Sequence, residues 1–294
     1  MSTDIFAAID IGSNAIRLLI NNIKGYKSGQ DYKKLAYLRV PIRLGEDVFT
    51  EGIISDEKKH RLIEAMQGFH HLINAYNVKS YKACATSAMR DASNGKEIEQ
   101  LIREKTGINI QIISGDEEAE IIYKAGGLNE LLDKNKNYLY VDVGGGSTEI
   151  VLYSKQQKIT AKSFQMGTVR ALVSAVSETE EKLFKQQLKK ISKQYSPLSI
   201  IASGGNINKV YKILGNRENE VSYTEMKVLY DTLKDMSYEE RMLAFKLNPY
   251  RADVIIPALK IFLTVAKVCK INTIHVPKVG LVDGIIHQLY DSTK

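Results

Sequence analysis

Apolar stretches alternate with amphipathic stretches along most of the chain. Short apolar runs, typical of buried strands, are followed by segments in which apolar residues recur every three or four positions, as in helices that pack on a sheet. The clearest helical segment begins at Ser55 and places on one face Leu62, Met66, Phe69 and Ile73. This alternation of strands and helices predicts an α/β fold with mixed sheets.

The first half is expected to hold three strands and then helices and strands in alternation. We place its strands at residues 5–10, 15–23, 35–44, 80–85 and 108–113. Asn94 can cap a helix that ends before Gly107, and Ser114 opens another helix. These elements predict a first domain over residues 1–127.

The second half repeats this order, with strands expected at residues 138–143, 149–153, 158–165, 198–202 and 273–276. Helices are expected at residues 168–195 and after Gly205, followed by an all-helical insert at about residues 222–270 and a last helix from Leu281. The boundary is placed near Gly126-Gly127, which gives a second domain over residues 128–294. Its last helix is a candidate for packing on the first domain.

The two halves also share a motif in which an apolar strand ends in Asp and a Gly-rich turn follows. The first copy is Asp10-Ile11-Gly12-Ser13-Asn14, and the second is Asp142-Val143-Gly144-Gly145-Gly146-Ser147. A third turn, Gly204-Gly205-Asn206, follows a strand and opens a helix. Glycine allows the backbone to approach a ligand closely, so that successive N–H groups can surround an anion. The repeat predicts two similar halves that bind phosphate from two sides, although any one such turn can also be a simple hairpin.

Three carboxylates accompany these turns. Asp10 and Asp142 end the strands before the first two turns, and Glu149 stands on the strand after the second turn. A carboxylate beside a phosphate is repelled unless a cation lies between them, and Mg²⁺ prefers one or two carboxylates together with phosphate oxygens. We therefore expect these residues to bind Mg²⁺ or another divalent cation. The alternative is that each aspartate caps its own turn.

Two further segments contain candidate catalytic and phosphate-binding side chains. Ser114 and Glu117 match a capping box, which leaves the neighbouring Glu118 available as a general base. Acidic residues are also common in first helical turns for structural reasons, so the residues alone leave this role open. Arg90 follows the strand at residues 80–85, where its guanidinium suits a phosphate oxygen or pairs with a surface acid.

Composition narrows the class of protein. The 294 residues are 44% hydrophobic, enough for two cores without disulfides, and we expect Cys84 and Cys269 to be buried reduced thiols. No apolar run approaches the length of a membrane span and no signal peptide is evident, so we expect a cytoplasmic protein without a membrane partner. The net charge of +7 suits a polyanionic ligand, but no nucleic-acid-binding motif accompanies the scattered lysines, and no nucleic-acid partner is expected.

The motifs together resemble the exopolyphosphatase / guanosine pentaphosphate phosphatase (Ppx/GppA) family in its short two-domain form. The matching stretches follow the family order over nearly the whole chain and are AIDIGSNAIRLLI, LGEDVFTEGIIS, ATSAMRDASN, IISGDEEAE, YVDVGGGSTEIVL, QMGTVRA, ASGGNINKV, RADVIIPALKIF and GLVDGII. The resemblance implies two ribonuclease-H-like domains of the actin and sugar-kinase type, with a cleft between them.

The resemblance also implies roles for single residues, and the family's general base corresponds to Glu118. The residues expected to bind phosphate, from these matches and from the Gly-rich turns, are Ser13, Asn14, Arg17, Arg90, Gly144, Gly145, Gly146, Ser147, Gly204 and Gly205. The residues expected to bind the metal are Asp10, Asp142 and Glu149.

The implied activity is Mg²⁺-dependent hydrolysis of terminal phosphoanhydride bonds. It would release orthophosphate from polyphosphate or convert pppGpp to ppGpp in the stringent response. Longer members carry a third, helical HD-type domain, which these residues do not include, and Val282 and Ala258 depart from the usual family residues, so substrate preference stays open. Members often pair, so a homodimer is considered beside a monomer. A kinase or ATPase of the same superfamily, and a non-catalytic sensor of an alarmone or polyphosphate, are the alternative functions.

Overall fold

The chain divides into two compact units. The computed structural model describes residues 3–26, 29–123, 133, 135–215, 218–277 and 279–293. The first unit comprises residues 1–126 and 280–294, and the second comprises residues 127–279. Residues 280–294 thus group with the first unit and not with the segment that precedes them. The Gly126-Gly127 pair, at which we place the domain boundary, lies outside the described residues.

The first unit is built on a mixed sheet, whose described strands follow the order β3-β2-β1-β4-β5. The first three strands are antiparallel neighbours, whereas β4 runs parallel to both β1 and β5. The strands are β1 (Thr3–Ile11), β2 (Ile16–Tyr26), β3 (Gly29–Val40), β4 (Ser80–Ala85) and β5 (Ile110–Ile112). The helices are α1 (Leu44–Glu51), α2 (Asp56–Ala75), α3 (Ser87–Asp91), α4 (Gly95–Thr106), α5 (Gly115–Tyr123) and α14 (Leu281–Asp291).

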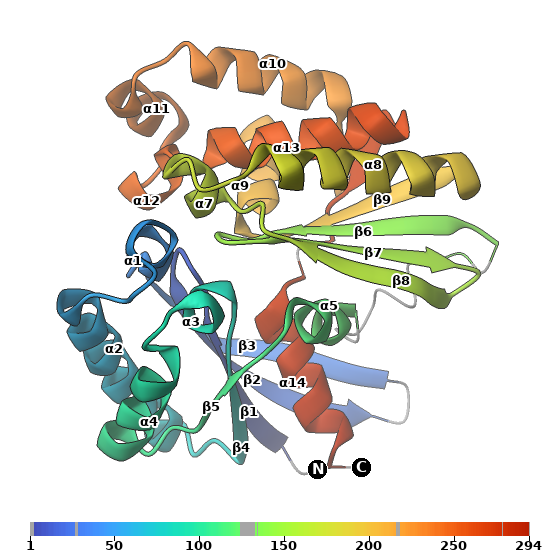
Figure 1. The fold of residues 1–294 in the computed structure, drawn as a ribbon. Helices are drawn as coiled ribbons and strands as arrows, with labels where there is room; N and C mark the ends of the chain where they lie inside the picture. Colours follow the sequence, from blue (N-terminus) through green and yellow to red (C-terminus); the bar gives the residue numbers. More distant parts are fainter. Residues whose placement is uncertain are drawn as a thin grey trace. The chain divides into compact units, whose positions relative to one another are not determined.

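Helices cover both faces of this sheet (Figure 1). On one face, the apolar residues of α2 and α4 share a core with Ile9 and Ile11 of β1 and with Leu18 of β2. On the other face lies α14, whose Tyr290 ring meets Phe6 of β1 edge-on, with 6.2 Å between the ring centroids. Because successive residues of a strand point to opposite faces, one continuous apolar run in β1 serves both helical layers.

The second unit is also built on a mixed sheet, with the order β10-β11-β9-β6-β7-β8 among the described strands. The strands are β6 (Asn137–Val143), β7 (Thr148–Ser154), β8 (Gln157–Phe164), β9 (Leu198–Ser203), β10 (Glu220–Ser222) and β11 (Thr273–His275). The helices are α7 (Thr168–Leu172), α8 (Glu178–Gln194), α9 (Gly205–Leu214), α10 (Tyr223–Lys234), α11 (Tyr238–Phe245), α12 (Pro249–Ala252) and α13 (Ile255–Cys269).

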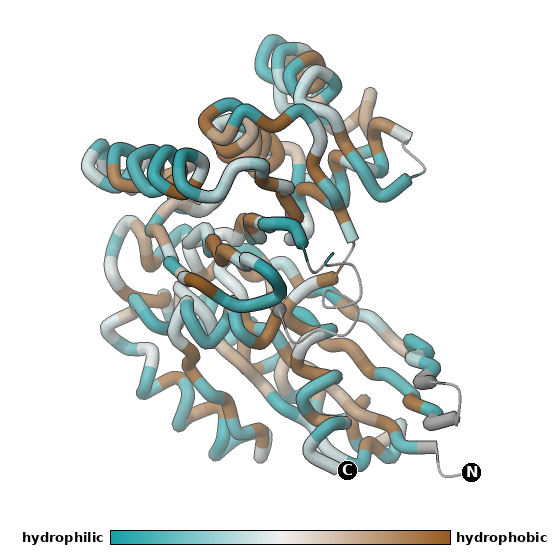
Figure 2. Tube along the Cα trace, turned by 90° about the vertical axis from the view of Figure 1, so that its right-hand side faces the viewer, coloured by the Kyte–Doolittle hydropathy of each residue, from teal (hydrophilic) through white to brown (hydrophobic). Residues whose placement is uncertain are grey.

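The main core of the second unit lies on one side of its sheet, against α8, α9 and α13 (Figure 1). Leu139 and Val141 of β6, Phe184 of α8 and Phe262 of α13 belong to this core, and α10 packs on α13. Figure 2 shows hydrophobic residues recurring along the strands, whereas many helical turns are hydrophobic on one side and hydrophilic on the other. Among the described helices, we find none that is long and apolar enough to cross a membrane.

The two sheets share one topology. Strands β1, β2, β3 and β4 correspond to β6, β7, β8 and β9, in the same order and with the same directions. β11 takes the place of β5 beside the parallel strand, and β10 extends the second sheet. The predicted α/β fold with mixed sheets is therefore confirmed. The repeated turn belongs to a strand arrangement that occurs in both units.

Two local details differ from the sequence expectations. The sequence predicts a strand through residue 44, but β3 ends at Val40 and α1 begins at Leu44. Asn94 precedes α4 without capping it through its side chain. Its amide instead accepts from the N–H of Ile54 at 3.1 Å and donates to the Ile54 carbonyl at 2.9 Å. A tertiary contact has replaced the predicted local one.

The two cysteines are free and buried, as predicted. Cys84 lies in β4, and Cys269 is the last residue of α13. Burial raises the pKa of each thiol to about 12. Both thiols therefore stay protonated near neutral pH, which makes them poor nucleophiles and suits a packing role.

Candidate active site

The two Asp-x-Gly turns have the same geometry, each within its own unit. The N–H of Gly12 donates to the carbonyl of Ala15 at 3.2 Å, and the N–H of Gly144 donates to the carbonyl of Ser147 at 3.0 Å. Each turn joins two antiparallel strands, β1 to β2 and β6 to β7. The aspartate at the end of the first strand is therefore paired with a residue near the start of the second.

The residue opposite the aspartate differs between the two turns. Asp10 is opposite Arg17, and Arg17 Nη1 forms an ion pair with the Asp10 carboxylate. Asp142 is opposite Glu149, so the second turn places two carboxylates side by side. Arg17 compensates the charge of Asp10, whereas two adjacent carboxylates repel each other.

The carboxylate pair of the second unit fits a divalent cation. Both side chains offer hard oxygen ligands, and neighbouring residues in an antiparallel pair have their side chains on the same face of the sheet. Asp142 and Glu149 would hold Mg²⁺ or a similar ion together with phosphate oxygens. Asp10 stays a predicted ligand, with Arg17 as its observed partner.

The glycine loop that follows Asp142 is held by α7. Backbone N–H groups of residues 168–170 donate to the carbonyls of Gly144 and Gly145 at 2.8–3.1 Å, and Arg170 Nε donates to the Gly146 carbonyl at 2.9 Å. The C=O and N–H of a trans peptide point in opposite directions. Because its carbonyls face α7, the loop turns N–H groups the other way, which is the arrangement that an anion requires.

The third Gly-rich turn precedes α9 and has basic side chains around it. The Arg251 guanidinium packs against Gly205, and its Nη1 donates to the side-chain oxygen of Asn206. Lys209 lies one turn further along α9, and burial, together with Lys212 and Arg251, lowers the pKa of its amine. A helix N-terminus with cations beside it suits a phosphate group.

Ser13 and Asn14 lie in a loop that is braced within the first unit. The hydroxyl oxygens of Ser13 and Ser87 are 2.9 Å apart. The carbonyl of Ser13 accepts from the N–H of Gly45 at 2.8 Å, and that of Asn14 accepts from the N–H of Arg43 at 3.1 Å. The start of α1, which the sequence did not predict as a helix, therefore fixes the backbone of the first loop.

Arg90 lies in α3, directly after β4. Its Nη1 donates to the carbonyl of Ile113 at 2.9 Å, and its Nε lies 3.7 Å from the Asp91 carboxylate. The guanidinium thus ties α3 to the end of β5 and pairs with an acid, as the alternative interpretation predicts. A guanidinium has five N–H donors, so these contacts are compatible with a phosphate ligand, and that role stays a prediction.

The capping box predicted at the start of α5 is present. The N–H of Ser114 donates to Glu117 Oε2 at 2.7 Å, and the N–H of Glu117 donates to Ser114 Oγ at 3.2 Å. The hydrogen bond from the Ser114 backbone lowers the pKa of Glu117, which makes this carboxylate a weaker proton acceptor. Glu118 is not part of the cap and is the better candidate for a base.

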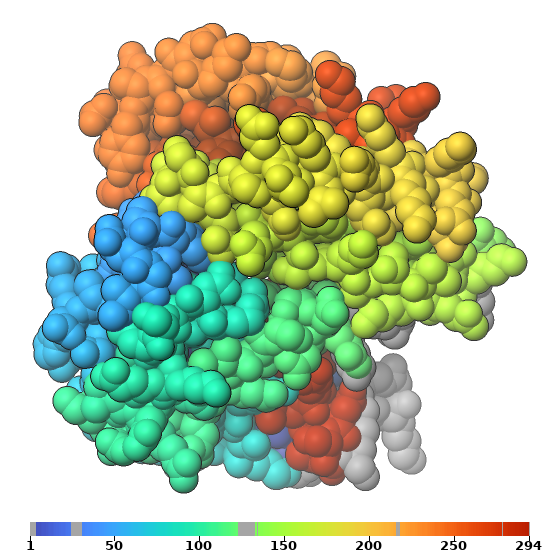
Figure 3. Space-filling model, viewed as in Figure 1, coloured from blue at the N-terminus to red at the C-terminus, as the bar shows by residue number. Residues whose placement is uncertain are grey.

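The last helix of the chain supports α5 from within the first unit. Gly284 of α14 lies so close to α5 that a Cβ atom on it would be 2.1 Å from the carbonyl oxygen of Ile121. Ile121 is one turn after Glu118 in α5. Figure 3 shows the surface of α14, in red, next to that of α5, in green. The contact between the two helices therefore helps to fix the position of Glu118.

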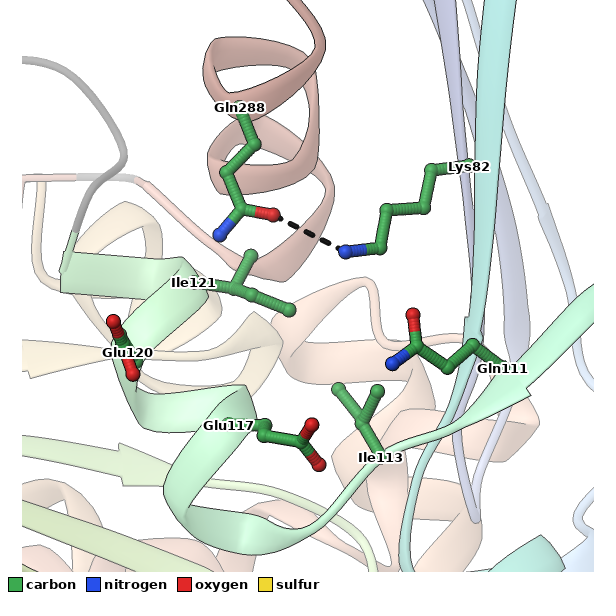
Figure 4. A pocket seen from close by; sticks show the side chains of 7 residues that line it. All are labelled: Lys82, Gln111, Ile113, Glu117, Glu120, Ile121 and Gln288. Atoms are coloured by element: carbon green, nitrogen blue, oxygen red, sulfur yellow. Dashed lines mark hydrogen bonds between the residues drawn. The ribbon is translucent and has the colours of Figure 1, made fainter. Parts of the chain in front are cut away.

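A pocket of about 200 Å³ lies beside this helix contact (Figure 4). Lys82 reaches from β4 toward α14, and its Nζ donates to Gln288 Oε1 at 3.3 Å. Glu117 and Glu120 of α5 line the same pocket. Two carboxylates beside one ammonium disfavour a phosphate, so we do not assign the phosphate site to this pocket.

Replacing Gly284 with alanine is expected to impair catalysis through α5. The added methyl group would collide with the Ile121 carbonyl, which belongs to the backbone and cannot rotate away. We expect a loss of about 1–3 kcal/mol in the free energy of unfolding, and a fall in phosphate release of up to about 100-fold if Glu118 moves by about 1 Å. Urea denaturation and a phosphate-release assay measure the two effects.

Gly280→Ala is the matched control for this prediction. Gly280 precedes the same helix in an extended conformation, and a Cβ atom there would lie 4.0 Å from its nearest neighbour, Asp283 Oδ2. We expect a small change in stability and near-normal phosphate release. If Gly284→Ala behaved like this control, α14 would not be positioning α5.

Sequence reasoning missed the supporting roles of Gly167, Arg170 and Arg251. Arg170 binds the glycine loop and Arg251 packs on the turn before α9, so both act on segments that are distant in sequence. Gly167 packs against the same loop, where a Cβ atom would be 2.3 Å from the Gly145 carbonyl oxygen. Gly167 and Arg170 lie in the stretch QMGTVRA, and Arg251 begins RADVIIPALKIF. Both stretches carry the family resemblance, and that match is the signal that could have pointed to these residues.

Comparisons with known proteins show similarity to one family over nearly the whole chain. A family model for the Ppx/GppA phosphatase family matches residues 23–293. The crystal structure of the Aquifex aeolicus Ppx/GppA family member has a TM-score of 0.78 and 26% identity, and the match covers 100% of this chain and 99% of that one. An exopolyphosphatase structure from Cytophaga hutchinsonii has a TM-score of 0.85 and 22% identity, with 99% of both chains covered.

A bifunctional 3-dehydroquinate synthase/phosphatase of Fusobacterium nucleatum is 35% identical over 169 residues. These residues are 56% of this chain, and they span only 25% of that relative. The fold matches the ribonuclease-H-like fold of the solved family members over its full length. Because the family model covers nearly the whole chain, this protein belongs to the Ppx/GppA phosphatase family.

Proposed function

We propose that this phosphatase hydrolyses terminal phosphoanhydride bonds in a metal-dependent reaction. The substrate would be inorganic polyphosphate, pppGpp, or both. The observation that carries the proposal is the pair of carboxylates, Asp142 and Glu149, beside a glycine loop whose N–H groups face away from α7. A cation site next to an anion site is what a phosphoanhydride requires.

The proposal assigns the phosphate-binding residues by their position in each unit. In the second unit, the loop at residues 144–147 would bind the terminal phosphoryl group through backbone N–H groups. The N-terminus of α9 at Gly204 and Gly205, with Arg251 beside it, would bind the phosphates that follow. In the first unit, Ser13, Asn14, Arg17 and Arg90 would contribute side chains.

Hydrolysis would proceed by attack of water on the terminal phosphorus. Glu118 would take a proton from the attacking water as its oxygen forms a bond to phosphorus. The bond between that phosphorus and the bridging oxygen breaks, and the bridging oxygen leaves as part of the shortened phosphate chain. The guanidinium of Arg90 and the loop N–H groups would stabilise the negative charge of the transferred group.

Asp142 and Glu149, together with Asp10 as a predicted ligand, would hold the divalent cation. When bound, the cation would neutralise part of the negative charge of the phosphate oxygens, so that these two carboxylates could lie beside a polyanion.

The test is orthophosphate release from tripolyphosphate, long-chain polyphosphate and pppGpp, each with Mg²⁺ and with EDTA. We expect release that depends on Mg²⁺, and the ratio among the substrates gives the preference. Tight pppGpp binding without release would indicate a sensor, and phosphate transfer from ATP to a small acceptor would indicate a kinase. Either result, without hydrolysis of any of the three substrates, would overturn the proposal.

A further inference from the structure

Four polar side chains form one row across the sheet of the second unit. Ser203 of β9 is paired with Asp142 of β6, Asp142 with Glu149 of β7, and Glu149 with Ser163 of β8. Residues paired in register have their side chains on the same face of a sheet. The two carboxylates therefore lie in the middle of the row, with a serine at each end.

Each serine donates a hydrogen bond to the carboxylate next to it. Ser203 Oγ donates to Asp142 Oδ1 at 2.8 Å, and Ser163 Oγ donates to Glu149 Oε1 at 2.8 Å. A carboxylate held by one oxygen has the direction of its other oxygen fixed as well, because the group is planar. Both hydroxyl donors are neutral, in contrast to the Arg17 guanidinium beside Asp10.

Tyr140 extends the hydrogen-bond chain on the Asp142 side. Its hydroxyl donates to Ser203 Oγ, and both side chains are buried. The direction of the chain is fixed, because a carboxylate only accepts and the single hydroxyl proton of Ser203 is used on Asp142. Tyr140 must therefore be the donor, and it holds the Ser203 hydroxyl in the rotamer that reaches Asp142.

The residue after Ser203 brings the end of β9 close to Asp142. Gly204 has a φ of 103°, and a Cβ atom on it would lie 2.8 Å from Asp142 Oδ1. Both the conformation and the space favour glycine here. The backbone thus holds Ser203 and Asp142 together in addition to their hydrogen bond.

We propose that Tyr140, Ser203 and Ser163 are positioning residues, which orient the carboxylates of Asp142 and Glu149 so that they can bind a divalent cation. This inference rests on the proposed function, which assigns the cation to these two carboxylates. Partners that hydrogen-bond a metal-ligating carboxylate commonly change metal affinity by about 10–100-fold when they are removed.

The experiment measures Mn²⁺ binding directly by electron paramagnetic resonance, without turnover, in the wild type and in Ser203→Ala, Tyr140→Phe and Ser163→Ala. We expect each variant to bind Mn²⁺ about 10-fold more weakly. Tyr140→Phe keeps the ring in the core and removes only the hydroxyl, which preserves the fold. Ser199→Ala is the matched control, since Ser199 lies on the same strand, is paired with Tyr138, and should leave Mn²⁺ affinity unchanged.

A second readout separates positioning from general damage. If the hydroxyls position the carboxylates, the Mg²⁺ concentration for half-maximal phosphate release rises, and saturating Mg²⁺ restores most of the rate. Wild-type Mn²⁺ affinity in both Ser203→Ala and Tyr140→Phe would overturn the positioning role and leave the proposed function standing. Absence of Mn²⁺ binding in the wild type would overturn the metal assignment, and this inference with it.

Discussion

Glu118→Gln is expected to abolish orthophosphate release while leaving Mg²⁺-dependent binding of polyphosphate intact. Glutamine has the shape of glutamate, but its amide cannot accept the proton of the attacking water. Loss of a general base typically costs about 10²- to 10⁴-fold in rate. Phosphate release measures the rate, and equilibrium binding of a labelled polyphosphate measures the affinity.

The structure explains why Glu118, and not its neighbour, should show this effect. Glu117 is engaged in the capping box with Ser114, so replacing it would weaken the start of α5. Glu118 has no part in that cap, and α5 itself is held in place by Gly284 of α14. We therefore expect Glu118→Gln to unfold at the same urea concentration as the wild type.

Glu120→Gln is the matched control on the same helix. The Glu120 side chain is exposed and lines the pocket to which we assign no phosphate. Glu120→Gln therefore removes the same negative charge as Glu118→Gln, but at a different position on α5. Near-normal phosphate release is expected from this variant. Release at a near-normal rate from Glu118→Gln as well would remove Glu118 from the catalytic role.

The repeated fold could be predicted because its signal is local. An Asp followed by a Gly-rich turn between two apolar runs defines a hairpin, and two such hairpins, each followed by helices and a parallel strand, define the topology. The paired carboxylates at Asp142 and Glu149 were predicted for the same reason, since both lie within one hairpin.

Contacts that depend on register or on distant segments could not be predicted. Arg17 was expected to contact phosphate, and only the pairing of β1 with β2 shows that it faces Asp10. Asn94 is a residue type that often caps helices, but its side-chain amide forms hydrogen bonds to the backbone of Ile54 instead. The row from Ser203 to Ser163 combines four strands, and no window of sequence contains it.

Gly167→Ala is expected to lower phosphate release strongly, because residue 167 packs against the glycine loop at residues 144–147. Gly167 has φ −116° and ψ 167°, a conformation that any residue adopts, so the effect of alanine is one of space alone. A Cβ atom would lie 2.3 Å from both the Gly145 carbonyl oxygen and the Gly146 carbonyl carbon. Since both are backbone atoms, either the loop or α7 must move.

Movement of α7 would break the bonds that turn the loop carbonyls toward it. The N–H of Val169 and the Nε of Arg170 would lose their carbonyl partners, and the loop N–H groups would no longer converge on a phosphate. We expect phosphate release to fall by about 100-fold and the free energy of unfolding to fall by about 1–3 kcal/mol. Phosphate release and urea denaturation of the purified variant measure the two effects.

Gly68→Ala separates this effect from the general consequence of adding a methyl group. Gly68 is exposed in the middle of α2, and a Cβ atom there has no neighbour within 4 Å among the described residues. Alanine favours a helix over glycine by about 0.5–1 kcal/mol, so this variant should be more stable than the wild type and equally active. If Gly167→Ala were as active as Gly68→Ala, the contact between α7 and the glycine loop would have no part in binding phosphate, and the N–H groups of that loop would have to be oriented by the turn alone.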